Sequence, residues 1–156
     1  MDEVYAMSLA YHPIFDCIQM KDDVVYVVYE YYDYDGNLLY VGSSKDFYNA
    51  HFRNVLDTEW GDEIFAICLY PYDSQEEINI GKRQRIASKK PKYNRFVYKD
   101  NGMHVESPYE EVWITNSELC MYWYVWHITR RIFEVCGVNT NDILHKRNMI
   151  VEGVNA

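Results

Sequence analysis

The sequence predicts a domain of the α/β (α+β) class, in which helices flank a small, mainly antiparallel sheet of three strands. Strand-like runs of β-branched and aromatic residues and segments of helical periodicity follow one another in the order β-β-α-β-α. The 156 residues are 49% hydrophobic and 25% charged, which suits a single buried core. We expect an N-terminal extension at 1–21, the domain at 22–99, and a C-terminal extension at 100–156 that packs on it.

The first predicted unit is a β-hairpin. Residues 22–32 read DDVVYVVYEYY, a composition typical of a central strand. Asp35 and Gly36 suit the positive-φ positions of a tight turn, and residues 37–42 (NLLYVG) form the return strand.

A helix and a third strand follow the hairpin. Ser43 and Ser44 can cap a helix over residues 45–56. Residues 63–70 (EIFAICLY) predict a buried strand, which we expect to end at Pro71.

A second helix is predicted over residues 74–89, and Pro91 stops it. Gly81 weakens the middle of this helix by about 1 kcal/mol relative to alanine. Residues 109–115 then favour one more strand, which we place in the C-terminal extension.

The most hydrophobic helix begins at Ser117 and is expected to stop at Gly137, and a short helix is predicted over residues 141–148. Large apolar residues are too many for a peripheral helix; they include Trp123, Trp126, Ile132 and Phe133. We therefore expect this Trp-rich helix to cover the sheet on one side and to offer any exposed remainder to a partner, including a second copy of the chain in a homo-oligomer.

Charge and cysteine content limit the class of protein. Lysine and arginine number 15 against 24 acidic residues, so the net charge of −9 is opposite to that of a typical phosphate-coating protein. The four cysteines form no CxxC pair, which favours a reducing, cytoplasmic location. No apolar run is long enough to span a bilayer, so no membrane partner is expected.

One arrangement of residues carries a family resemblance. Val-Val-Tyr at 27–29 is followed, after ten residues, by YVGSSKDF at 40–47, and KPKYN stands at 90–94. In joint order and spacing, residues 24–94 resemble the GIY-YIG nuclease superfamily, best its homing-endonuclease and repair-nuclease branches. Members hydrolyse phosphodiesters with two tyrosines on adjacent strands, a helical arginine that steadies the phosphate, and a glutamate that holds Mg²⁺.

The resemblance assigns four positions and breaks at two that matter for catalysis. Tyr29 and Tyr40 take the tyrosine positions, Gly42 the tight turn, and Asn94 the closing asparagine. The arginine and glutamate positions instead hold Ala50 and Lys82, and Val27 replaces the first glycine. Because a lysine repels a divalent cation, we expect a pseudoenzyme that needs no cofactor.

A displaced catalytic set is the alternative. Arg53 follows Ala50 by nearly one helical turn, His51 is adjacent, and Glu77 precedes Lys82 by five residues. In an active nuclease, Tyr29 and Tyr40 would work with Arg53 and His51, and Glu77 would hold Mg²⁺. Alternatively, the two tyrosines are ordinary hairpin residues, and His51 is a partly exposed helix residue.

The basic residues cluster strongly. Residues 82–95 contain 7 of the 15 positive charges and no acidic residue, whereas residues 1–36 hold eight acids against Lys21 alone. With Lys45, the cluster makes up the predicted nucleic-acid-binding set: Lys45, Lys82, Arg83, Arg85, Lys89, Lys90, Lys92 and Arg95. The alternative is a solvated face without a partner.

These features predict a non-catalytic GIY-YIG-like module that binds nucleic acid or a nucleic-acid-processing protein. A role as a phage or mobile-element antagonist of a host nucleic-acid enzyme would follow from the resemblance together with the acidic surface. The alternatives are an active, divergent metal-dependent endonuclease, and a structural oligomer built through the Trp-rich helix.

Overall fold

The computed structural model describes residues 24–137. In chain order its elements are β1 (Tyr26–Tyr32), β2 (Leu38–Ser44), α2 (Phe47–Asp57), the 3-10 turn η2 (Gly61–Glu63), β3 (Ala66–Tyr72), α3 (Gln75–Lys89), β4 (Val112–Thr115) and α4 (Asn116–Val135). The strands, α2 and α3 belong to one compact unit, and α4 belongs to another. The predicted 1–21 extension and the predicted 141–148 helix lie outside the described residues.

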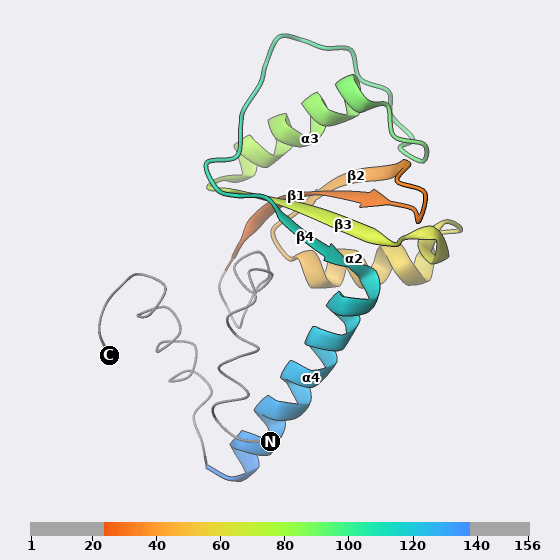
Figure 1. Cartoon of the computed structure of the whole chain (residues 1–156). Helices are drawn as coiled ribbons and strands as arrows, with labels where there is room; N and C mark the ends of the chain where they lie inside the picture. Colours follow the sequence, from red (N-terminus) through yellow and green to blue (C-terminus); the bar gives the residue numbers. More distant parts are fainter. Residues whose placement is uncertain (1–23, 138–156) are drawn as a thin grey trace. The chain divides into compact units, whose positions relative to one another are not determined.

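The described part of the chain is α+β with a four-stranded antiparallel sheet in the order β2-β1-β3-β4 (Figure 1). The prediction of three strands is wrong, because β4 pairs with β3 from Ala66 opposite Thr115 to Leu69 opposite Val112. The strand that we placed in the C-terminal extension is therefore an edge strand of the same sheet.

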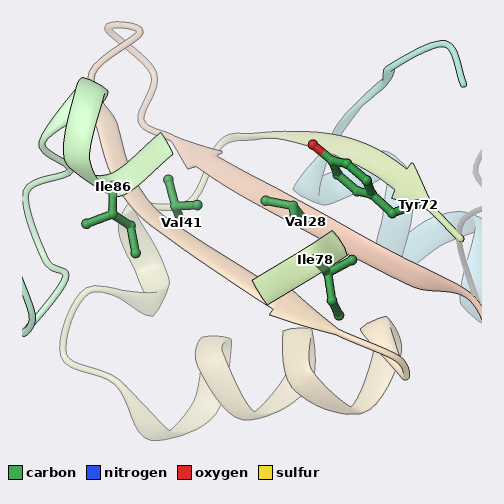
Figure 2. Packing of buried hydrophobic residues seen from close by; sticks show 5 residues of the cluster. All are labelled: Val28, Val41, Tyr72, Ile78 and Ile86. Atoms are coloured by element: carbon green, nitrogen blue, oxygen red, sulfur yellow. The ribbon is translucent and has the colours of Figure 1, made fainter. Parts of the chain in front are cut away.

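The alternation of β1 side chains separates the two faces of the sheet. Val28 belongs to a buried cluster with residues of α3, whereas Tyr31 on the opposite face hydrogen-bonds to His51 of α2. Figure 1 shows α3 on one face of the sheet and α2 on the other. Figure 2 shows the packing on the α3 face, where the cluster comprises Val28, Val41, Tyr72, Ile78 and Ile86.

Local chemistry explains where the elements begin and end. Asp46, and not Ser43 or Ser44, caps α2, since its Oδ1 accepts a hydrogen bond from the Asn49 backbone N–H at 3.4 Å. Ser74 caps α3, with its Oγ accepting from the Glu77 N–H at 3.2 Å. At the other end of α3, Lys90 adopts the left-handed conformation with φ 50°.

Pro71 does not end β3, as we expected, but lies within it, opposite Val27 of β1. Because the pairing with β4 stops at Leu69, Pro71 occupies a position where β3 has a strand on one side only. A missing N–H is tolerated at such an edge position.

A segment that follows α3 covers the outer edge of β2. The N–H groups of Lys92 and Tyr93 donate to the carbonyls of Leu38 and Leu39 at 3.2 and 2.8 Å. The Asn94 side chain then accepts from the Val41 N–H and donates to the Val41 carbonyl, both at 2.9 Å. The side-chain amide thus takes the place of a strand partner for Val41.

Asn94→Ala is expected to lower the free energy of unfolding by about 1–3 kcal/mol, because it removes both hydrogen bonds to a buried residue. Urea denaturation measures the change, with Asn101→Ala in an exposed loop as the control. A loss no larger than that of the control would show that Asn94 does not hold this edge.

Helix α4 begins at Asn116 directly after β4, and Gly137 adopts a positive φ of 82° just beyond its end, as the sequence predicted. The side chains of Trp123, Trp126, Ile132 and Phe133 lie outside the described residues, so their expected packing stays a prediction. None of the described helices has both the length and the apolar character needed to cross a bilayer.

Candidate functional site

The two tyrosine positions of the family resemblance come together on the α2 face of the sheet. Tyr31 lies opposite Tyr40, and Tyr29 lies opposite Gly42, on the paired strands β1 and β2. The ring centroids of Tyr29 and Tyr40 are 6.2 Å apart. A Cβ at position 42 would come within 2.3 Å of the Tyr29 phenol, so only glycine leaves room for this ring across β2.

Tyr29 is buried and is held by α2. The Asn54 amide donates to the hydroxyl groups of both Tyr29 and Tyr31, at 3.0 and 3.1 Å. Burial, with a smaller contribution from nearby Tyr40, raises the pKa of the Tyr29 phenol. Tyr40 is only half-buried, and its phenol pKa is also raised by burial.

His51 is fully buried, so its interpretation as a partly exposed helix residue is wrong. Its Nε2 lies 2.8 Å from the Asn116 carbonyl oxygen Oδ1, and its Nδ1 lies 2.8 Å from the Tyr31 hydroxyl. With Nε2 as the donor to Asn116, Nδ1 accepts from Tyr31. Burial lowers the pKa of His51 to about 4. His51 is therefore a neutral, structural imidazole that a phosphate could not reach.

Because burial disfavours the charged imidazole in the folded state alone, stability is highest above pH 6.5 and falls as the pH drops from 6.5 to about 4. The total change is about 3 kcal/mol. An NMR titration should show His51 still neutral at pH 5. A His51 midpoint near 6.5 would contradict this assignment.

Three stacked rings border a cleft at the β2 edge of the sheet, which we name the first cleft. The rings of Tyr40 and Trp60 have centroids 4.9 Å apart, and Trp60 and Tyr93 are nearly parallel at 5.7 Å. The cleft has a volume of about 650 Å³. Phe96 also lines it, with 71% of its surface exposed. Aromatic surface is thus available to a ligand.

The first cleft carries charges of both signs on different elements. Lys82 of α3 and Arg95 line it together with Tyr40 and Asn94. Asp57 and Glu59, from the end of α2 and the following turn, line it too. The structure therefore brings Lys82 beside two residues that the family resemblance selected.

Only part of the basic run faces solvent. Arg85 is buried: its Nη1 donates to the Tyr72 hydroxyl at 2.8 Å, and its guanidinium lies 4.0 Å from the Tyr70 ring centroid. Lys89 forms an ion pair with Glu30 at 2.7 Å. Arg85 therefore belongs to the buried layer beneath α3, and the charge of Lys89, although its side chain is exposed, is paired with a buried carboxylate.

The other basic residues remain accessible. Arg83 lies over the Tyr98 ring, 4.7 Å from its centroid, and Lys92 lies over Tyr93. Exposed cations elsewhere in the predicted set are Lys45 and Lys90. Of the predicted set, Lys82 and Arg95 line the first cleft.

Glu30, which sequence reasoning did not single out, is a fully buried carboxylate on the α3 face. It accepts hydrogen bonds from the Tyr32 and Tyr70 hydroxyls, both at 3.0 Å, in addition to the Lys89 ammonium group. Glu30 stands two residues after Val28, so strand alternation puts both side chains on the same face of the sheet. This spacing was the signal in the sequence.

The displaced catalytic candidates do not converge. Arg53 is exposed on α2, where its Nε donates to the Asn49 carbonyl at 3.3 Å. Glu77 lies in the first turn of α3, and its carboxylate accepts from the Ser74 hydroxyl at 3.0 Å. Since α2 and α3 flank opposite faces of the sheet (Figure 1), the two side chains belong to different surfaces. Among the side chains that the structure describes, no group of three or more from His, Cys, Asp or Glu is arranged to hold a metal.

No family model matches the chain, and neither a curated protein nor a solved structure is similar enough to count as a match.

Proposed function

We propose that this chain is a non-catalytic nucleic-acid-binding module whose ligand occupies the first cleft. The observation that carries the proposal is the meeting of two cations, Lys82 and Arg95, with the exposed ring of Phe96 in one cleft. Cations bind phosphates, and aromatic rings stack on bases. The segment 78–99, which supplies both cations, contains no acidic residue, and the carboxylates that line the cleft, Asp57 and Glu59, come from the end of α2 and the following turn.

The same geometry supports binding without cleavage. By the family resemblance, Lys82 stands at the position where those nucleases have a metal-binding carboxylate. Lys82 also lines the first cleft together with Tyr40 and Asn94. Tyr29 is 4% exposed and bonded to Asn54, so its phenol is poorly placed to assist an attacking water. Loss of a group that stabilises transition-state charge typically lowers a rate by about 10²–10³.

Fluorescence anisotropy with a labelled 20-nucleotide DNA strand tests the binding. We expect affinity to fall as salt rises, with a log–log slope of roughly −1 to −2 if two phosphates are neutralised. Lys82→Ala should weaken binding and make the slope less steep. Absence of binding at low salt would remove the proposal.

A plasmid-nicking assay with Mg²⁺ or Mn²⁺ tests the absence of cleavage. We expect no nicking by the parent chain. The double variant Ala50→Arg, Lys82→Glu asks whether the two expected groups restore any activity. If the parent nicks and either Arg53→Ala or Glu77→Ala abolishes it, the chain is instead the divergent endonuclease.

A further inference from the structure

A second cleft lies between α3 and the loop that follows it. It has a volume of about 370 Å³, and its lining includes Lys82, Arg83, Tyr98, Asn101 and Met103. Two of these residues are cations, and the wall also offers an aromatic ring and a side-chain amide. This is the same combination of groups that the first cleft contains.

The two clefts are neighbours, because Lys82 and Tyr98 line both of them. Arg83 is exposed and lines the second cleft, where its guanidinium lies over the Tyr98 ring. A phosphate chain that leaves the first cleft past Lys82 would meet Arg83 next.

The helix gives the length of this path. Asn79 lines the second cleft and Ile86 the first, and they lie seven residues apart on α3. At 1.5 Å per residue, the separation along the helix is about 10 Å. Phosphates of an unstacked single strand lie farther apart than the roughly 3.4 Å axial rise of a duplex strand, so this distance takes more than one nucleotide and at most about three.

The aromatic groups discriminate between single and double strands. Phe96, with 71% of its surface exposed in the first cleft, can stack only on a base whose face is free. Bases in a duplex are stacked on each other, so a duplex presents mainly phosphates and groove edges. The ring surface adds affinity only for an unpaired strand.

From these observations we infer that the two clefts form one continuous site for a single-stranded nucleic acid longer than a mononucleotide. A mononucleotide would fill one cleft only, and a duplex would leave the aromatic surface unused. This inference rests on the proposed function and specifies the ligand and its path.

Competition of oligothymidylates of 2, 4 and 8 nucleotides, and of a 20-base-pair duplex, against a labelled 8-mer tests the inference. The variants are Arg83→Glu in the second cleft and Arg95→Glu in the first. Arg131→Glu, at an exposed position of α4, is the charge-matched control. We expect tighter binding of the 4-mer than of the 2-mer, and weaker binding of the duplex. Arg83→Glu should weaken the 8-mer roughly tenfold and the 2-mer less than twofold, whereas Arg95→Glu should weaken both.

The outcomes separate the inference from the proposed function. If Arg95→Glu weakens the 8-mer but Arg83→Glu matches the Arg131→Glu control, the site is confined to the first cleft and the continuous path is wrong. A duplex that competes better than the 8-mer also overturns the inference. If no oligonucleotide competes at low salt, the proposed function itself fails.

Discussion

Glu30→Ala is expected to lower the free energy of unfolding by roughly 3 kcal/mol. Breaking a buried ion pair from one side typically costs about 3–5 kcal/mol, because the other partner is left uncompensated. The Lys89 side chain is 41% exposed and can recover water, which places the loss at the lower end. The Tyr32 and Tyr70 hydroxyls also lose their common acceptor.

Urea denaturation at pH 7 measures this loss. Glu30→Gln keeps an acceptor and nearly the same volume, so we expect a smaller loss. Glu76→Ala on exposed α3 surface is the control and should change stability by less than about 0.5 kcal/mol. If Glu30→Ala is as stable as that control, the buried carboxylate does not hold the β1–α3 layer together.

Reversal of both cations of the first cleft is expected to abolish binding of single-stranded DNA. Lys82→Glu with Arg95→Glu should weaken binding roughly a hundredfold at low salt, because two phosphate contacts are lost and two repulsive charges are added. Anisotropy titration measures the affinity, and the thermal transition of each variant shows whether the fold is retained. Arg131→Glu should bind like the parent.

Unchanged affinity of the folded double variant would move the site away from the first cleft. Other exposed cations, such as Lys90 and Lys92 after α3 and Lys45 before α2, would then be the groups to test.

The hairpin and the two helices of the sheet unit could be predicted from the sequence because their signals are local. β-branched and aromatic runs, the positive-φ turn at Gly36 and the Ser74 cap each act within a few residues, although Asp35 does not take the positive φ that we expected for it. The fourth strand was predicted as a segment but not as part of this sheet. Its pairing with β3 joins residues about 45 positions apart, and no local pattern encodes that choice.

Partners of polar residues could not be predicted for the same reason. Arg85 and Lys89 belong to a continuous basic run. In the structure, however, Arg85 is buried against Tyr72, and Lys89 forms an ion pair with Glu30. Burial of His51 depends on Tyr31 and on Asn116, which is 65 residues away along the chain. Charge counts describe the composition of a segment but not the direction of its side chains.

The candidate site was predicted in part. Tyr40, Lys82 and Asn94 were selected by position, and they do line one cleft. Trp60 and Phe96 were not selected, although a large aromatic residue within a polar connecting segment was a signal for a contact surface.

Photocross-linking tests the central proposal, nucleic-acid binding in the first cleft, most directly. A single-stranded oligonucleotide that carries bromodeoxyuridine is irradiated with the protein, and the modified peptides are identified by mass spectrometry. We predict cross-links to Tyr93, Phe96 or Tyr98, and their loss in the Lys82→Glu, Arg95→Glu variant. Cross-links confined to aromatic residues away from the cleft, such as exposed Trp113 on β4, would contradict the proposal.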